Sequence, residues 1–173
     1  MGWIQTYSGH VFEPMSPTVE QIDIVDIAHA LSLTCRFNGH CSRFYSVAEH
    51  SIWVSRHVPL EHAKWGLLHD AGEAYVSDVA RPIKPFITGF EEIETGIMRM
   101  VQEKFELRGA MPGPVHEADI RMLATERRQL MRPNERRWDE LRGFRPYALE
   151  LPCWTPDEAE EKFMARCREL GIN

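Results

Sequence analysis

Cysteine is scarce in the chain, and the few cysteines form no motif. The 173 residues contain four cysteines, and no two of them stand in a Cys-x-x-Cys pair. The sequence also lacks the basic and then apolar run of a secretory signal, and no apolar stretch approaches the length of a transmembrane helix. We therefore expect reduced thiols in a cytoplasmic protein, in a bacterial cytosol or, if a phage encodes it, in the host cytosol.

An excess of basic residues is also missing. Asp and Glu outnumber Lys and Arg by 26 to 20, which gives a formal net charge of -6. Lys and Arg bind a nucleic-acid polymer mainly through its phosphates, so this balance argues against such a partner. It still allows a small anionic substrate, which a few local cations and a metal ion can hold.

Internal repeats and low-complexity segments are absent as well. A length of 173 residues, of which 43% are hydrophobic and 27% charged, is typical of one globular domain spanning residues 1–173. Alternating residues around a Ser8-Gly9 turn predict a short hairpin over 3–12. Apolar residues at helical spacing predict helices over 22–37, from 46 onward, 60–76, 90–107, 115–131 and 156–171. We expect a mainly α-helical, compact bundle with a minor N-terminal β-hairpin.

Two of these helices begin with a capping-box pattern, in which Ser or Thr is followed by Glu three residues later. The first pattern is Ser46 with Glu49, and the second is Thr155 with Glu158. The segment 133–154 shows no clear period. The arginine-rich runs 126–128 and 135–137 contain acidic residues, which predicts a solvated face or a subunit contact.

The chemistry of the chain is concentrated in segment 67–74, which reads Leu-Leu-His-Asp-Ala-Gly-Glu-Ala. His69, Asp70 and Glu73 stand there in an otherwise apolar helical run. Burying such groups is costly unless a metal ion or a polar network neutralises them. Their i,i+3 and i,i+4 spacings place the three side chains on one side of a helix. We interpret this segment as the floor of a metal site.

Two further side chains complete the predicted ligand set. His50 lies near the start of the preceding helix, and Asp119 comes from a later helix that is otherwise apolar. With His69 and Asp70 they supply two imidazoles and two carboxylates. Such a mixed set suits a divalent ion, and Mn, Co, Zn, Fe, Ni and Mg all remain open.

Two other histidines compete for a place in this set. His62 lies seven residues before His69, on the same helix face, and His116 lies one turn before Asp119. A single histidine on a helix is more often structural or solvated than a ligand, so both also remain open as surface residues.

The ordered set His50, His69-Asp70 and Asp119 resembles the signature of the HD-domain metal-dependent phosphohydrolases. The resemblance is carried by the local sequences YSVAEHS at 45–51, LLHDAGEA at 67–74 and EAD at 117–119. It runs from about residue 22 to residue 131 and is greatest to small bacterial 5′-deoxynucleotidases and phage dATP triphosphohydrolases. It implies metal-dependent hydrolysis of nucleotides, with 2′-deoxynucleoside monophosphates or with dATP and other deoxynucleoside triphosphates as substrates.

The same resemblance implies roles for single residues. It implies that the four signature residues bind the metal and that Glu73 serves as a base or orients water. Asp78 matches a carboxylate near the sugar, and together with Glu73 it can hold an additional metal. The substrate contacts that the resemblance implies are Arg36, Phe37, Asp78, Pro82 and Lys84. The deoxynucleotidases tend to have Trp at the position of Phe37, so this departure leaves the shape of the base or sugar pocket open.

Simpler interpretations exist for several of these residues. Arg36 can cap the C-terminus of its helix, Phe37 can belong to the core, and Lys84 can be a solvated surface residue. Two other functions share parts of the pattern. A di-iron oxygenase of the HD fold needs additional histidines, and a non-catalytic nucleotide-binding HD domain is expected to lack a ligand. The small relatives assemble, so the resemblance also implies a homo-oligomer, a dimer or a hexamer.

Overall fold

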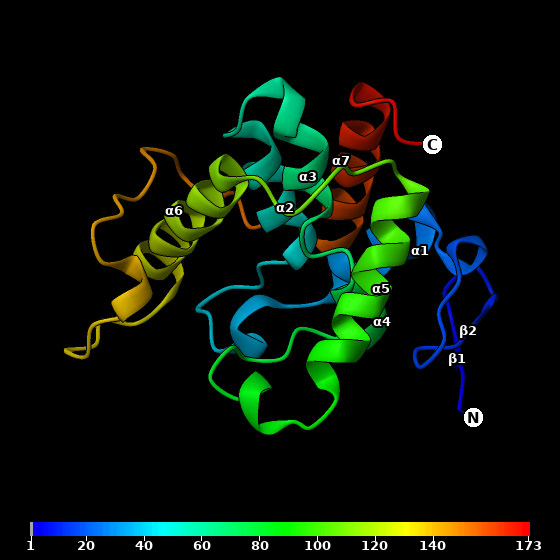
Figure 1. Cartoon of the computed structure of the whole chain (residues 1–173). Helices are drawn as coiled ribbons and strands as arrows, with labels where there is room; N and C mark the ends of the chain where they lie inside the picture. The colour runs from blue at the N-terminus through cyan, green and yellow to red at the C-terminus, as the bar shows by residue number, and fades with distance from the viewer. Residues whose placement is uncertain (1) are drawn as a thin grey trace.

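The computed structural model describes residues 2–173 and is mainly helical, with one antiparallel hairpin at its N-terminal end (Figure 1). The hairpin pairs β1 (Ile4–Gln5) with β2 (Val11–Phe12), and Gly9 turns the chain with a φ of 85°. The α-helices are α1 (Ile24–Leu33), α2 (Val47–Arg56), α3 (Ala63–Leu68), α4 (Glu73–Val76), α5 (Phe90–Lys104), α6 (Gly113–Leu130) and α7 (Pro156–Glu169). The predicted fold class, mainly α with a short N-terminal hairpin, is confirmed.

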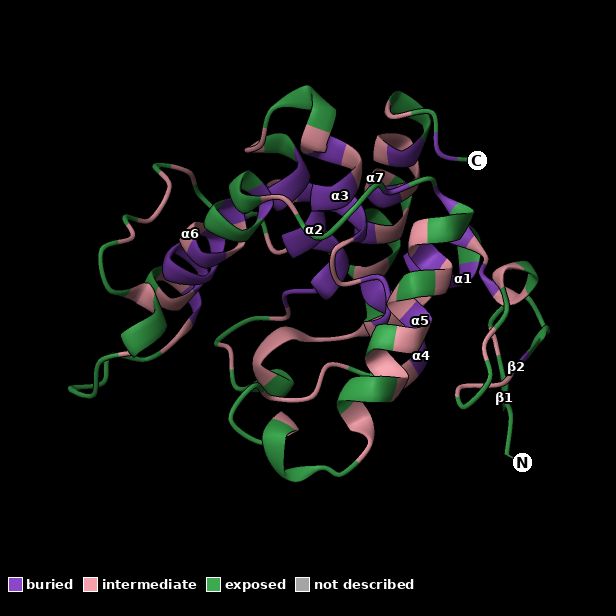
Figure 2. Ribbon diagram, viewed as in Figure 1, coloured by how far each residue is buried: buried purple, intermediate pink, exposed green. Residues whose placement is uncertain are grey.

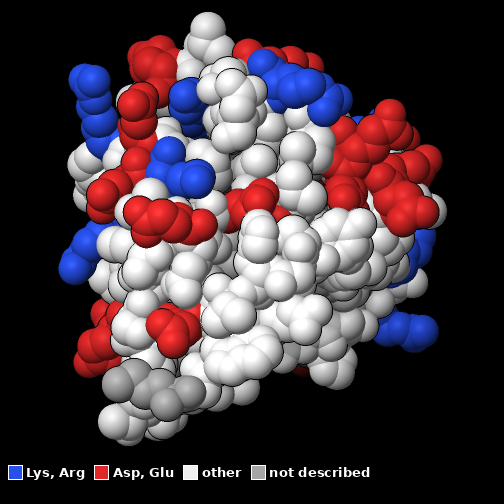
Figure 3. Space-filling view, turned by 90° about the vertical axis from the view of Figure 1, so that its right-hand side faces the viewer, with Lys and Arg blue, Asp and Glu red and all other residues white. Residues whose placement is uncertain are grey.

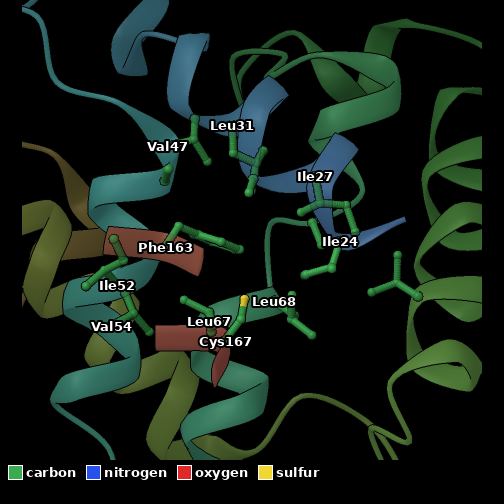
Figure 4. Close-up of a cluster of buried hydrophobic side chains, with 14 of the residues drawn as sticks. Ile24, Ile27, Leu31, Val47, Ile52, Val54, Leu67, Leu68, Phe163 and Cys167 are labelled. Carbon is green, nitrogen blue, oxygen red and sulfur yellow. The ribbon is translucent and has the colours of Figure 1, made fainter. Parts of the chain in front are cut away.

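The central helix is α2, which packs against α1, α3, α6 and α7. Figure 2 shows the buried residues gathered on α2 and α3 and on the inner faces of the helices around them. Figure 4 shows the core between these helices, which includes Ile27, Leu31, Ile52, Val54, Leu67, Leu68, Phe163 and Cys167. Leu67 and Leu68 directly precede His69, and both side chains are fully buried. Their burial therefore holds His69 at the edge of the hydrophobic core.

The start of α2 confirms one half of the predicted capping box and corrects the other. The Oγ atom of Ser46 accepts a hydrogen bond from the backbone N–H of Glu49 at 3.0 Å. The Glu49 carboxylate does not return to Ser46. It is fully buried and accepts hydrogen bonds from the backbone N–H groups of Cys153 and Trp154 at 3.2 and 2.7 Å. Glu49 therefore ties α2 to the segment before α7, where the second predicted capping box is complete.

The predicted helix over 22–37 ends early. Its helical part, α1, stops at Leu33, and Thr34 and Cys35 are extended. The chain pairs here with the segment before α2: Thr34 O accepts from the N–H of Val47 at 3.0 Å, and Arg36 N–H donates to Tyr45 O at 2.9 Å. This pairing between residues nine and thirteen positions apart replaces the last helical turn. Arg36 consequently lies in a separate 3₁₀ turn and does not cap the C-terminus of α1.

The predicted helix over 60–76 is wrong in its middle. It is divided into a 3₁₀ turn (Leu60–His62), α3 and α4, with tight turns over residues 69–72. In a continuous helix the N–H of Gly72 would donate to Leu68 O, but here it donates to Met98 Sδ of α5 at 3.2 Å. The N–H of Glu73 donates to Asp70 O at 3.0 Å, an i→i+3 bond. Side chains three apart eclipse in such turns, so Asp70 and Glu73 lie on one side.

Gly66 allows α3 to lie directly against α2. A Cβ atom at Gly66 would lie 2.9 Å from Ser55 Cα, which is backbone and cannot move aside cheaply. Gly66→Ala is therefore expected to lower the free energy of unfolding by about 1–3 kcal/mol, measured by urea denaturation. Gly96→Ala in α5 is the matched control, since nothing lies within 4 Å of its Cβ. It is expected to gain about 0.5–1 kcal/mol, and equal behaviour of the two variants would contradict the close packing.

Charge is distributed unevenly over the surface. Figure 3 shows acidic side chains clustered at one upper edge of the face on which the hairpin lies, whereas the lower part of this face carries few charges. The hairpin region exposes the apolar side chains Trp3, Tyr7, Val11 and Met15. Within residues 2–173, no helix is both long enough and apolar enough to cross a membrane. All four cysteines are free within residues 2–173.

Candidate metal centre

The four predicted ligands converge although they come from three parts of the chain. His50 lies on α2, His69 and Asp70 follow α3, and Asp119 lies on α6. The Nε2 atom of His50 is 3.3 Å from His69 Nε2 and 3.2 Å from Asp119 Oδ1. Asp70 Oδ2 is 3.3 Å from His69 Nε2 and 3.8 Å from His50 Nε2. His50, His69 and Asp119 each offer one ligand atom, all within 4.8 Å of one another.

The other nitrogen of each imidazole is already engaged. His69 Nδ1 lies 2.9 Å from the carbonyl oxygen of Gly66, which can only accept, so this nitrogen carries the proton. His50 Nδ1 lies 2.6 Å from Glu126 Oε1. With both Nδ1 atoms acting as donors, each imidazole directs its Nε2 atom toward the same point, and in the neutral form of the ring this atom carries the lone pair that can bind a metal ion. Such outer hydrogen bonds are typical of histidines that bind metals.

This donor set fits a divalent cation. Two ligands that each lie about 2.1 Å from an ion are about 3.0 Å apart in octahedral and about 3.4 Å apart in tetrahedral geometry. The separations around His50 Nε2 are in this range or slightly longer. Two facing lone pairs beside two carboxylates repel one another unless a proton or a metal ion lies between them. His50, His69 and Asp119 could therefore hold a metal ion. Asp70, the fourth predicted ligand, lies outside this group of three, although its Oδ2 is close to both imidazoles.

The pKa values of the side chains in the cluster also indicate that its carboxylates stabilise a nearby positive charge. Burial and the charge of Arg36 lower the pKa of His50, but the carboxylates of Glu126 and Asp119 outweigh both and raise it to about 9. Burial raises the pKa of Asp119, but the hydrogen bond and charge of His50 outweigh it and lower the pKa to about 2. Burial also raises the pKa of Asp70, but the positive charges of His69, His50 and Arg36 outweigh burial and hold this pKa far below its usual range. The carboxylates therefore stay ionised, as metal ligands must.

Arg36 and Glu126 flank the centre, and the position of Glu126 differs from the predicted one. Arg36 Nε donates to Glu126 Oε2 at 3.1 Å, and its Nη1 lies 3.7 Å from Asp70 Oδ2. The guanidinium, which the resemblance assigns to phosphate, is thus directed at two carboxylates. Glu126 was expected on a solvated face with its arginine neighbours, but it is fully buried against His50. The sequence could have indicated this position, because Glu126 lies seven residues after Asp119 and therefore on the same face of the helix.

Glu73 lies beside the cluster, and one of its carboxylate oxygens, the buried Oε2, has no hydrogen-bond partner among residues 2–173. Burial raises the pKa of Glu73 well above its usual range, and the charges of Asp70 and Asp78 add to the rise. An unpartnered carboxylate oxygen of raised pKa is suited to accept a proton, which matches the predicted role. Glu73 and Asp78, the predicted pair for an additional metal, belong to neither group of possible metal ligands found among residues 2–173.

A cavity of about 470 Å³ opens next to His69, Asp70 and Glu73. The remaining residues that line it are Trp65, Gly72, Lys84, Glu94, Thr95, Met98, Arg99, Gln102, Ala110 and Met111. Lys84 therefore reaches the site, as predicted, although its Nζ is paired with Glu94 at 2.6 Å. Pro82 is exposed and does not line the cavity. Arg81, which the sequence did not single out, brings its Nη2 to 4.0 Å from Asp119 Oδ2.

Phe37 lies in a strained turn beside Arg36. Phe37 and Asn38 both have positive φ, 56° and 51°, a conformation that residues with side chains rarely adopt. The Phe37 ring is half-buried and lies 6.1 Å from the ring of Trp138, a residue of the segment for which no structure was predicted. An aromatic pair therefore stands next to the metal centre where the deoxynucleotidases tend to have one tryptophan. Trp138 gave no signal in the sequence, since its segment has no regular period.

The rival ligands do not join the centre. His62 and His116 belong to neither of the two groups of possible metal ligands found in residues 2–173. The second group consists of His10, Asp23 and Asp26 near the hairpin. Its carboxylates are engaged locally: Asp26 accepts from the N–H and hydroxyl of Ser8, and Asp23 caps α1. This second cluster is thus explained by hydrogen bonds that join the hairpin to α1.

Comparison with known proteins adds relatives but no activity. No family model matches the sequence. The chain is 40% identical over 173 residues to the uncharacterized protein YfdR of Escherichia coli (strain K12), which covers 99% of this chain and 97% of that protein. It is 35% identical over 126 residues to the uncharacterized protein RCAP_rcc00048 of Rhodobacter capsulatus, which covers 67% of this chain and 64% of that protein. The chain belongs to the family of YfdR.

Proposed function

We propose that this protein is an HD-domain, metal-dependent phosphohydrolase of nucleotides, with 2′-deoxynucleoside mono- or triphosphates as substrates in the cytoplasm. The observation that carries the proposal is the convergence of two imidazole Nε2 atoms and two carboxylates. The distances are 3.2–3.8 Å for the pairs His50–His69, His50–Asp119, His50–Asp70 and His69–Asp70. The order of these ligands in the sequence is the order of the HD signature. The metal identity is left open to Mn, Co, Zn, Fe, Ni and Mg.

The residues around the centre support hydrolysis of a phosphate ester. A bound divalent ion supplies Lewis acidity toward phosphate oxygens and acidifies water. Glu73 has the free, buried oxygen that can take up the proton of the attacking water. Lys84 and Arg81 are the cations placed to balance phosphate charge, because one lines the cavity and the other lies near Asp119.

The cavity supports a substrate of nucleotide size. Its volume of about 470 Å³ lies in the range of about 300–1,000 Å³ that is usual for small-molecule sites. His69, Asp70 and Glu73 give its wall a charged part, whereas Trp65 and Met98 give it an apolar part. A phosphate beside the charged residues would leave the nucleoside against the apolar part.

The direct test is hydrolysis of a nucleotide panel. The purified chain is incubated with Mn²⁺ or Co²⁺ and with dAMP, dATP, the other deoxynucleotides and their ribose counterparts, and the products are separated by chromatography. We expect turnover that stops with a chelator and returns with metal. Release of single phosphate from dAMP would identify a deoxynucleotidase, and release of triphosphate from dATP a triphosphohydrolase. Stoichiometric metal without turnover of any nucleotide would contradict the proposal.

A further inference from the structure

Glu126 is a fully buried carboxylate whose two oxygens serve two different partners. It lies on α6, two helical turns after Asp119. Its Oε1 atom is 2.6 Å from His50 Nδ1, and its Oε2 atom accepts from Arg36 Nε at 3.1 Å. His50 and Glu126 are both 0% exposed, so water does not compete for these bonds. Nothing in the chemistry proposed above uses this carboxylate.

The geometry constrains the protons. Arg36 Nε is always a donor, so Oε2 of Glu126 must accept. Oε1 then accepts the Nδ1 proton of His50 at the short distance of a charge-assisted hydrogen bond. This places the Nε2 lone pair of His50 toward His69, Asp70 and Asp119. Arg36 in turn keeps the carboxylate of Glu126 from rotating away.

We propose that Glu126 is a positioning residue, which fixes the tautomer and ring orientation of His50 and thereby sets the metal affinity of the site. This inference rests on the proposed function only in that the same centre binds a metal. It also assigns Arg36 a role that the resemblance does not imply, namely orientation of Glu126.

An amide at position 126 cannot replace the carboxylate. Gln offers one acceptor oxygen and one NH₂ group on opposite sides of its amide. If the oxygen faces Arg36, the NH₂ faces His50 Nδ1 and favours the tautomer whose proton sits on Nε2, in the ligand position. If the oxygen faces His50, the NH₂ meets the donor of Arg36. Asp keeps the charge but is one methylene shorter, so it cannot hold both partners at the present distances.

The experiment measures metal affinity rather than turnover. Co²⁺ is titrated into the metal-free full chain, and binding is followed by its visible spectrum. We expect Glu126→Gln to raise the Kd about 10–100-fold, the usual effect of losing an outer hydrogen-bond partner, and Glu126→Asp to lie between it and the wild type. Nitrogen-15 NMR of the metal-free protein should show the hydrogen-bonded Nδ1 proton of His50, and Glu126→Gln should lose it.

Glu49→Gln is the matched control. Glu49 is equally buried and precedes His50, but its carboxylate binds only backbone N–H groups. We expect it to lose stability and keep the wild-type Kd. A wild-type Kd in Glu126→Gln would overturn the role of Glu126 and leave the proposed function intact, whereas a wild type without metal would overturn the proposed function. If Glu126→Gln does not fold, Glu126→Asp decides, since a wild-type Kd there would overturn the inference.

Discussion

Asp70→Asn is expected to remove metal binding and turnover together. Asp70 Oδ2 lies 3.3 and 3.8 Å from the two imidazole Nε2 atoms, and the sequence predicts it as the fourth ligand. Asn keeps the shape but loses the charge, and its NH₂ group cannot bind a cation. Loss of an outer partner weakens metal binding about 10–100-fold, so loss of a ligand is expected to exceed roughly 100-fold. Metal content after dialysis and nucleotide turnover measure the two effects.

Thermal stability gives an independent readout of the same change. A metal ion at 100 times its Kd stabilises the folded state by about 2.7 kcal/mol. For a chain of this length, that corresponds to a rise in Tm of roughly 5–11 °C. We expect this rise in the wild type and its absence in Asp70→Asn. A variant that still gained the full rise would show that Asp70 is not a ligand.

Asp26→Asn is the control that separates the two groups of possible ligands. Asp26 is a buried carboxylate that belongs to the group beside the hairpin and accepts from Ser8. Its replacement is expected to lower stability through the lost hydrogen bonds and to leave metal content and turnover unchanged. If Asp26→Asn lost the metal and Asp70→Asn kept it, the metal site would lie at the hairpin.

The convergence of His50, His69 and Asp119 was predictable because its signal is local. His69 and Asp70 are adjacent, and a charged pair within an apolar run already requires a neutralising partner. The cap at Ser46 fixed the start of the helix that carries His50, and the structure confirms that start. Only the distances among α2, α3 and α6 could not be predicted from the sequence, because they depend on how the helices pack.

The parts that sequence reasoning missed are set by contacts between distant segments. The break at residues 69–72 arises where Gly72 donates to Met98, a residue 26 positions later. Glu126 looked solvated because two arginines follow it, but its own side chain faces the centre and theirs do not. Glu49 looked like the second half of a capping box, but it is used by backbone groups more than 100 residues away. Local sequence patterns indicate which residues share a helix face, but they do not identify the distant residue that a side chain contacts across a packed interface.

Glu73→Gln is expected to separate turnover from metal binding. The carboxylate has a buried oxygen without a partner, and burial together with Asp70 and Asp78 raises its pKa. Loss of a general base costs about 10²–10⁴-fold, so we expect kcat to fall by that factor while the Kd of the primary metal changes little. Rapid-quench or steady-state assays with saturating Mn²⁺ measure kcat, and Co²⁺ titration measures the Kd. Glu49→Gln again serves as the buried control and should keep its turnover.

The pH dependence of the wild type tests the same role. A base must be ionised, so the rate is expected to rise as the pH increases through the pKa of Glu73. Burial and two neighbouring carboxylates raise that pKa above its usual value of about 4.3, although Arg36 and Lys84 oppose part of the rise. The acidic side of the pH–rate curve should therefore lie at a higher pH than it would for an ordinary Glu. The residual rate of Glu73→Gln should lack this pH dependence.

Metal stoichiometry decides between the two roles implied for Glu73. If Glu73 and Asp78 hold an additional metal, Glu73→Gln should reduce the bound metal by one equivalent and leave the equivalent at His50, His69, Asp70 and Asp119 in place. If Glu73 acts only as the base, the stoichiometry should not change. Loss of the primary equivalent would contradict both roles, because it would make Glu73 a ligand of the centre itself. The four ligands converge without it, so we expect the primary equivalent to remain.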